Sequence, residues 1–325
     1  MTERKPTPEG VAAAAKRLAP HVVRTPLLPL SWRGVRLRVK AECLQEGGSF
    51  KLRGATNRLL LLSEEERRRG VVAFSSGNHA QGVAIAARRL GIPATIVMPA
   101  DAPAVKRDAT LAAGAEIVAY DRATGSREEI AARLAEERGS ALVPSFDDVD
   151  VIEGQGSAGA EIAEQLGAPP DKVIVPCGGG GLSAGIALAL PGTQVVTVEP
   201  EGWDDMARSL AAGEPVPVEE PAPPTRCDAL QTKLVSPLTL GALRESRAQG
   251  VWVGEAQVER AMAFAARHLR IVAEPGGAVA LAALLAGKAG AVTERTVVVV
   301  SGGNVDPALY AAILAAQAAE AEAER

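Results

Sequence analysis

From about residue 70 to the end of the chain, short runs of β-branched residues alternate with longer segments of helical period. We expect strands at the β-branched runs, because valine and isoleucine suit pleated sheets and buried parallel strands are apolar on both faces. The predicted strands cover residues 70–74, 94–98, 116–119, 141–143, 172–175, 194–199, 251–253 and 296–300.

The segments between these runs repeat apolar residues every three or four positions, which is typical of helices with one buried face. They predict helices over residues 78–90, 103–113, 127–138, 156–166, 255–268, 278–286 and 307–322. Strands that alternate with helices in this order indicate βαβ units, and so an α/β protein with open parallel sheets and helices on both faces.

The length of 325 residues suits two domains. Residues 70–146 contain four strand–helix repeats, which are enough to close a sheet of their own. We therefore expect a large domain from residues 1–69 and 147–325, and a small, mobile domain from residues 70–146. Residues 213–225 (GEPVPVEEPAPPT) are rich in proline and glutamate and predict an extended surface connector.

Composition narrows the class of function. The chain is 47% hydrophobic and 23% charged, which is ordinary for a globular protein and argues against disorder. The 35 lysines and arginines against 39 aspartates and glutamates give a net charge of -4, and no basic run suggests a nucleic-acid surface. A small-molecule partner fits this composition better.

The cysteines and the N-terminus indicate the compartment. Cys43, Cys177 and Cys227 are odd in number and far apart, with no C-x-x-C pair or histidine cluster for a zinc site. The first ten residues, MTERKPTPEG, lack the apolar core of a signal peptide, and no apolar run reaches membrane-spanning length. We expect a cytoplasmic protein.

The first candidate site is a lysine, Lys51, that follows a glycine pair within residues 47–55 (GGSFKLRGA). An isolated lysine is usually a solvated surface residue. A buried lysine between small neighbours has a lowered pKa instead and can form a Schiff base with a carbonyl compound. The local sequence leaves both interpretations open.

The second candidate, residues 75–82 (SSGNHAQG), follows a predicted strand and opens a predicted helix. The unpaired N–H groups of a helix N-terminus bind carboxylate or phosphate. Serine and asparagine are also common N-caps, so a plain helix cap explains the segment about as well.

The third candidate is a run of four glycines, residues 178–181, between a predicted strand and a predicted helix. Such a loop can turn several N–H groups toward one anion, which indicates a phosphate site. Gly178-x-Gly180-x-x-Ser183 with Glu199 at the end of the next strand also imitates a dinucleotide fingerprint, although its last glycine is replaced. A nicotinamide-dependent dehydrogenase is therefore an alternative.

The fourth candidate, Ser301, follows the apolar strand 296–300 and precedes two glycines. Ligands of open α/β sheets bind at the carboxyl ends of strands. Ser301 is either a turn residue or a hydrogen-bond partner for a ligand.

In this order, the motifs resemble those of the fold-type II (tryptophan synthase β-like) enzymes that use pyridoxal 5'-phosphate (PLP), in the threonine/serine dehydratase and serine racemase group. The resemblance covers nearly the whole chain. It rests on SFKLRG at 49–54, SSGNHAQ at 75–81, GGGG at 178–181, EPGG at 274–277 and SGGNVD at 301–306.

The resemblance implies roles for individual residues. Lys51 would form the Schiff base with PLP, with Phe50 packed beside the ring, and Asn78 would bind the ring hydroxyl. The PLP phosphate would lie on the loop of Gly178, Gly179, Gly180 and Gly181. Ser301 would face the pyridine nitrogen as a neutral partner, which suits elimination of a β-substituent better than a long-lived carbanion.

The implied reaction is that of an L-threonine or L-serine ammonia-lyase, which gives a 2-oxo acid and ammonia. Lys51 would take the α-proton of the substrate. The substrate carboxylate would lie on the helix N-terminus formed by Ser75, Ser76, Gly77, Asn78 and His79.

Close relatives in this group leave other activities open. Ser76 matches a serine that protonates the opposite ring face in racemases and hydroxyaspartate dehydratases, so serine racemase and threo-3-hydroxyaspartate dehydratase are alternatives. Arg127 matches an arginine near the substrate pocket of serine racemases, although an arginine on a charged helix is usually solvated. A PLP-binding protein without turnover is a further alternative from another class.

The resemblance also implies a Mg²⁺ or Ca²⁺ site. Its ligands would be the carboxylates of Glu199 and Asp205 and the carbonyl of Trp203, because oxygen ligands suit these cations. A strand end followed by a helix cap explains the same residues about as well. Family habit predicts a homodimer.

Overall fold

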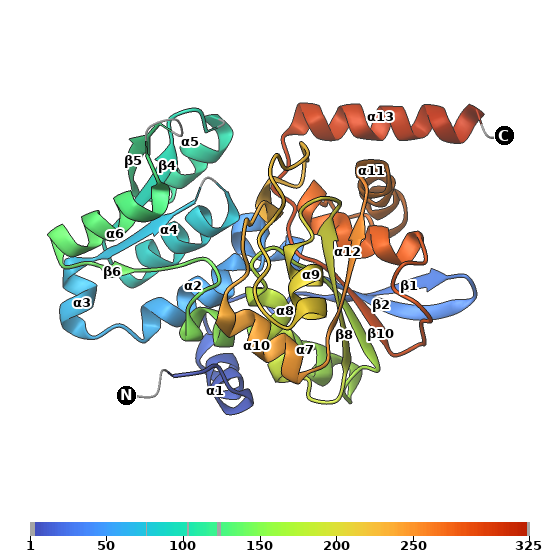
Figure 1. Cartoon of the computed structure of the whole chain (residues 1–325), viewed down its shortest axis with the longest axis horizontal. Helices are drawn as coiled ribbons and strands as arrows, with labels where there is room; N and C mark the ends of the chain where they lie inside the picture. Colours follow the sequence, from blue (N-terminus) through green and yellow to red (C-terminus); the bar gives the residue numbers. More distant parts are fainter. Residues whose placement is uncertain (1–3, 76, 103, 122–124, 324–325) are drawn as a thin grey trace.

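The computed structural model describes residues 4–75, 77–102, 104–121 and 125–323. The chain is an α/β protein with a six-stranded and a four-stranded sheet, each covered by helices (Figure 1). The predicted fold class is confirmed.

The two sheets differ in size and in strand direction. The larger has the order β1 (Leu27–Trp32), β2 (Val35–Ala41), β10 (Thr296–Val300), β7 (Lys172–Pro176), β8 (Gln194–Pro200) and β9 (Gln249–Val253). The smaller has the order β5 (Glu116–Tyr120), β4 (Ala94–Pro99), β3 (Val71–Phe74) and β6 (Ala141–Leu142). Only the β1–β2 hairpin is antiparallel among the described strands.

Helices fill the intervals between the strands. They are α1 (Pro8–Leu18), α2 (Lys51–Leu60), α3 (Glu64–Arg69), α4 (Asn78–Leu90), α5 (Ala104–Ala112), α6 (Arg127–Arg138), α7 (Val149–Leu166), α8 (Gly181–Ala189), α9 (Asp205–Ala212), α10 (Pro237–Glu245), α11 (Glu255–Phe264), α12 (Pro275–Leu285) and α13 (Pro307–Ala323). Short 3-10 helices cover Glu42–Leu44, Glu46–Gly48 and Asp228–Leu230, and a π-helix, Ala265–Leu269, continues α11.

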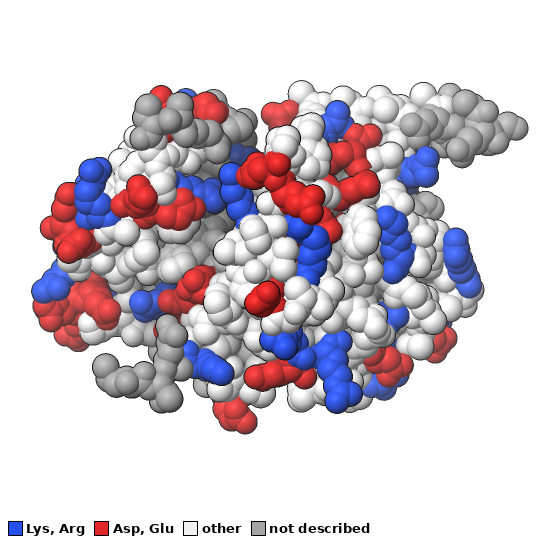
Figure 2. All heavy atoms as spheres, viewed as in Figure 1, with Lys and Arg blue, Asp and Glu red and all other residues white. Residues whose placement is uncertain are grey.

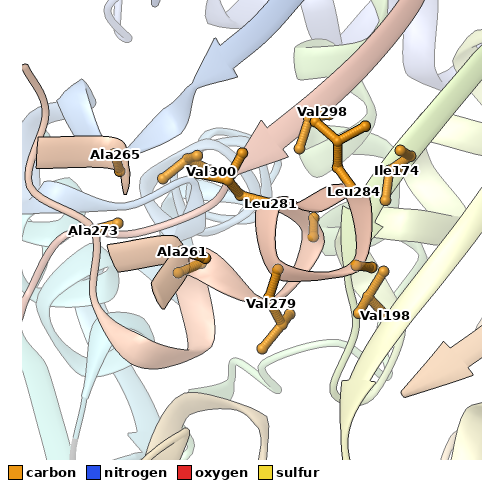
Figure 3. Close-up of a cluster of buried hydrophobic side chains, with 14 of the residues drawn as sticks. Ile174, Val198, Ala261, Ala265, Ala273, Val279, Leu281, Leu284, Val298 and Val300 are labelled. Atoms are coloured by element: carbon orange, nitrogen blue, oxygen red, sulfur yellow. The ribbon is translucent and has the colours of Figure 1, made fainter. Parts of the chain in front are cut away.

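The valines of β10 divide the core of the larger sheet in two. Val298 and Val300 pack on one face with α11 and α12, whose side chains include Leu281 (Figure 3). Val297 and Val299 point to the other face and join the core beneath α8 and α10. Because alternate side chains of a strand point to opposite faces, a strand that is buried on both must be apolar throughout.

The smaller sheet is also covered on both faces. Val72 and Val97 pack with Ala131 and Ala135 of α6. On the opposite face, the sheet shares a core with α2 and α4. This core ties the smaller sheet to α2, the helix that begins at Lys51.

Several elements have the predicted bounds, and others do not. The bounds of α4, α6 and β10 are as predicted, and residues 213–225 form neither helix nor strand. The prediction of a helix over 156–166 is wrong at its start, because α7 begins at Val149, where Asp148 caps it by accepting the Val151 N–H at 2.9 Å. The hairpin of β1 and β2 lies outside the predicted pattern.

The carboxyl ends of β7 and β10 meet at one edge of the larger sheet, since the two strands are parallel neighbours. The four-glycine loop follows β7 and Ser301 follows β10, so the topology brings these two motifs together. Acidic and basic side chains are interspersed on the face shown in Figure 2. Within the described residues, no helix has the length and apolar character that a membrane span requires.

Candidate active site

Lys51 is the first residue of α2, and its side chain points into the molecule. Its Nζ donates a hydrogen bond to the backbone oxygen of Ser145 at 2.8 Å and lies 5.3 Å from the centre of the Phe50 ring. Burial lowers the pKa of the Lys51 amine from 10.5 to about 8. An appreciable fraction of the amine is therefore uncharged and nucleophilic near neutral pH.

The segment before Lys51 is held against the segment that follows β10. Ser49 and Gly302 form an antiparallel bridge, and the Phe50 N–H donates to the Ser301 oxygen at 3.2 Å. The Gly303 N–H donates to the oxygen of residue 48 at 2.9 Å. These backbone contacts place the lysine and Ser301 side by side.

The side chain of Asn78, at the start of α4, is fixed by two other motifs. Its Nδ2 donates to Glu274 Oε1 at 2.6 Å, and its Oδ1 accepts from Asn304 Nδ2 at 2.8 Å. Asn304 Nδ2 also donates to the Gly47 oxygen at 2.7 Å. Burial raises the pKa of the Glu274 carboxyl to about 8. The network ties four of the five motifs into one site.

His79 lies beside Lys51 and is only 2% exposed. Its Nε2 hydrogen-bonds the Val143 oxygen at 2.8 Å, so Nε2 carries the proton and Nδ1 is a bare acceptor. Among the described residues, Nδ1 has no hydrogen-bond partner. Burial and the charge of Lys51 lower the pKa of the His79 ring to about 3, which keeps it neutral.

The N-terminus of α4 offers backbone donors. The first hydrogen bond of the helix runs from the Gln81 N–H to the Gly77 oxygen at 3.3 Å, so the amides of Asn78 and His79 have no intrahelical acceptor. A Cβ placed on Gly77 would meet nothing within 4 Å. The loop therefore opens onto space in which an anion can bind. Ser76 lies outside the described residues.

The four-glycine loop is closely packed on its protein side. Gly180 has a φ of +87°, and an added Cβ would lie 2.6 Å from Met206 Cε. A Cβ on Gly179 would lie 2.4 Å from the ring of Phe146. The first hydrogen bond of α8 runs from the Ala184 N–H to the Gly180 oxygen at 2.8 Å, which leaves the preceding amides for an anion.

Phe146 and Ser145 are adjacent in the chain, so the loop after β6 links the glycine loop to Lys51. Ser301 is 4% exposed, and its hydroxyl has no hydrogen-bond partner among the described residues. An amine, an anion cradle and an unpaired hydroxyl thus surround one region, and this combination fits PLP.

Arg127 lies at the edge of this region. Its guanidinium is 5.8 Å from the centre of the Phe74 ring, and Phe74 is the residue before the Ser75 loop. The side chain is 40% exposed and its Nε donates to Glu128 Oε1 at 2.8 Å. No contact reaches from Arg127 to another candidate residue in the part of the chain that is described.

The predicted cation ligands lie apart from Lys51, at the end of β8. Glu199 is fully buried and accepts the N–H groups of Met206 and Ala207 at 2.8 Å each. Asp205 is also fully buried, and neither of its carboxylate oxygens has a hydrogen-bond partner among the described residues. Burial raises the pKa of both carboxyls, that of Asp205 to about 7. The unpaired carboxylate fits a bound cation.

That cation would need a ligand beyond these two acids. No group of three or more histidine, cysteine, aspartate or glutamate side chains suited to a metal occurs in the described ranges. The predicted third ligand is the backbone carbonyl of Trp203.

Three contacts of the site have no signature in the sequence. The oxygen of Ser145 is a backbone group, and Phe146 contacts the glycine loop from a distant segment. Lys106 of α5 forms an ion pair with Asp228 across the site. Each depends on tertiary packing, and only Asp228 stands in a motif of the family.

The chain is similar to known proteins over almost its whole length. Residues 18–303 match the family model described as pyridoxal-phosphate dependent enzyme. The chain belongs to this family. It is 44% identical to an L-threo-3-hydroxyaspartate ammonia-lyase of Pseudomonas sp, over 94% of this chain and 97% of that protein.

Solved structures agree with the family. Maize serine racemase superposes with a TM-score of 0.89 at 34% identity and covers 98% of this chain and 100% of its own. A threonine deaminase from T.th. gives a TM-score of 0.84 at 43% identity and covers 93% and 99%. The cofactor is pyridoxal phosphate, and the protein is a PLP-dependent carbon–nitrogen lyase related to dehydratases and serine racemases.

The alternative of a nicotinamide-dependent dehydrogenase is set aside. In that reading, Glu199 would bind a ribose hydroxyl. Its carboxylate is instead buried and holds two backbone amides at the start of α9.

Proposed function

We propose that the protein converts L-serine or L-threonine to a 2-oxo acid and ammonia. The observation that carries this proposal is the Lys51 amine, with its pKa lowered to about 8, between the N-termini of two helices that present free amides. One helix end suits the cofactor phosphate and the other the substrate carboxylate.

The residues around Lys51 hold the cofactor. PLP, bound to Lys51 as a Schiff base, supplies the electron sink for loss of the α-proton and the β-hydroxyl. The glycine loop holds its phosphate, Asn78 donates to its ring hydroxyl and Phe50 packs beside its ring. Ser301 offers a neutral hydroxyl to the pyridine nitrogen.

The same residues place the substrate and move its proton. Its carboxylate accepts hydrogen bonds from the amides of the segment 75–79, and Lys51 Nζ takes the α-proton. The Ser145 oxygen, which already accepts from Nζ at 2.8 Å, holds the resulting ammonium group in place. His79 stays neutral and does not compete for the proton.

A second candidate substrate is L-threo-3-hydroxyaspartate. The similarity to the Pseudomonas ammonia-lyase favours it, and Arg127 stands beside the loop that would bind its α-carboxylate. Racemisation of serine is a related outcome, with Ser76 as the proton donor on the opposite ring face.

Further parts of the proposal concern the assembly and the cation. Glu199, Asp205 and the Trp203 carbonyl bind Mg²⁺ or Ca²⁺, supported by the unpaired Asp205 carboxylate. Residues 70–146 move as a small domain, the protein is a homodimer, and it acts in the cytoplasm.

The test combines a spectrum with product assays. The purified protein is saturated with PLP, and L-serine, L-threonine and L-threo-3-hydroxyaspartate are added in separate runs. A change in the visible band together with equal amounts of 2-oxo acid and ammonia is expected from at least one of them. A D-amino acid without 2-oxo acid would identify a racemase, and no product from any substrate would refute the lyase.

A further inference from the structure

One ion pair crosses the candidate active site. Lys106, on α5 beside the smaller sheet, donates through Nζ to Asp228 Oδ2. Asp228 begins the 3-10 helix Asp228–Leu230 in the larger part of the protein. The pair joins elements that cover different sheets.

The 3-10 helix forms a wall of the site. A Cβ on Gly178 of the glycine loop would lie 3.6 Å from the Ala229 oxygen, and a Cβ on Gly276 of α12 would lie 3.5 Å from the Ala229 Cβ. Residue 229 therefore stands between the phosphate cradle and the first turn of α12. Its neighbour Asp228 brings Lys106 to that wall.

The charges of the pair reach into the site. Burial raises the pKa of Glu274, which accepts from Asn78 at 2.6 Å; the charge of Asp228 raises this pKa further and that of Lys106 lowers it. Lys106 thus lies within electrostatic range of the residue that fixes Asn78.

The ammonium group of Lys106 has donors to spare. Lysine carries three N–H donors, and one acceptor, Asp228, is present among the described residues. The Lys106 side chain is 20% exposed, whereas that of Asp228 is 51% exposed. A partly desolvated cation with free donors suits a carboxylate ligand, because charge-assisted hydrogen bonds are stronger away from water.

We propose that Lys106 binds the second carboxylate of a dicarboxylic 3-hydroxy amino acid and so selects such substrates over L-serine and L-threonine. The inference rests on the proposed function and deepens it. With the α-carboxylate on the N-terminus of α4, the distal carboxylate points across the site. There it would be repelled by Asp228 unless Lys106 lay between them.

Equilibrium binding tests this without turnover. L-Aspartate has the second carboxylate but no β-hydroxyl to eliminate, and L-alanine lacks both. Calorimetry with the PLP-loaded enzyme should show that Lys106→Met weakens L-aspartate binding by roughly 10- to 100-fold. L-Alanine binding should change by less than about threefold. Arg107→Met is the matched control, since Arg107 is a neighbouring cation that is 47% exposed.

A second variant separates selection from a purely structural latch. Asp228→Asn removes the same ion pair but also a negative charge from the wall, so L-aspartate binding should stay the same or tighten. If Asp228→Asn weakens L-aspartate and L-alanine as Lys106→Met does, the pair is a latch and the proposal is overturned. It is also overturned if the wild-type enzyme does not prefer L-aspartate to L-alanine.

Failure of the proposed function has a different signature. The same preparations are assayed for 2-oxo acid from L-serine, L-threonine and L-threo-3-hydroxyaspartate. No product from any of them would refute the lyase, while the binding preference for L-aspartate would still report on Lys106.

Discussion

Replacing Arg53 with methionine should lower the free energy of unfolding by about 3–5 kcal/mol at neutral pH. Arg53 is fully buried in α2, two residues after Lys51. Its guanidinium donates to both oxygens of Glu42 at 2.8 Å each and to both oxygens of Glu161 at 2.7 and 2.9 Å. Methionine fills similar space but leaves the fully buried Glu42 carboxylate without this partner.

The loss should depend on pH through Glu42. Burial alone would raise the pKa of Glu42, but the charge and hydrogen bonds of Arg53 outweigh it and hold the pKa below 4.5. A carboxyl whose pKa is lowered in the folded state stabilises the fold above its unfolded pKa and loses that contribution as the pH falls through the folded pKa. The difference between wild type and Arg53→Met should therefore be largest near neutral pH and shrink below about pH 4.

Urea unfolding at several pH values measures this difference. The fluorescence of the three tryptophans reports the transition, with both proteins saturated with PLP. Arg58→Met is the matched control on the same helix: Arg58 is 19% exposed and lies 3.1 Å from Asp148, so its loss should be about 1 kcal/mol or less. Equal losses for the two variants, or a loss that does not change with pH, would refute the reasoning.

Three further predictions concern the cofactor and the cation. The rate of PLP uptake by the apoprotein should rise with pH and level off above about 8, because only the uncharged Lys51 amine attacks; a rate that is flat from about pH 6.5 to 9 would contradict this. Gly180→Ala should weaken PLP binding in an absorbance titration by at least about tenfold, because its Cβ would meet Met206 Cε at 2.6 Å. Gly192→Ala, at a similar φ of +85° with nothing within 4 Å, should bind PLP normally. Chelation should lower the melting temperature of the wild type by a few degrees but not that of Asp205→Asn, and equal shifts would argue against the cation site.

The fold could be predicted where local signals agree with burial. The strand Thr296–Val300 is apolar throughout because it is buried on both faces, and its bounds are as predicted. The helix α6 begins after a serine cap, Ser126, and ends at a glycine in the left-handed region, Gly139. These residues mark its ends without help from the rest of the chain.

Other elements needed tertiary contacts that the sequence does not display. Two glycines obscure the helical pattern at the start of α7, and one of them, Gly154, is required because a Cβ would lie 2.8 Å from the Cα of Gly54 on α2. In β2, Lys40 is fully buried and bonds Glu161 at 2.6 Å, so a charged residue stands where an apolar one would signal a strand. Close helix packing and buried ion pairs hide both elements.

The candidate site shows the same division. The motifs of Lys51, Asn78, the glycine loop and Ser301 are visible in the sequence, and the structure brings them together. The oxygen of Ser145 that meets Lys51 is a backbone group, which any residue could supply.

The most direct test of the account is Lys51→Ala, measured beside Lys16→Ala, which removes an exposed lysine of α1. Both proteins are incubated with PLP, freed of excess cofactor, and assayed for visible absorbance and for 2-oxo acid from the best substrate. The account predicts that Lys51→Ala loses both the visible band and the activity, while Lys16→Ala keeps them. A Lys51→Ala protein that remains coloured and active would contradict the assignment of this lysine.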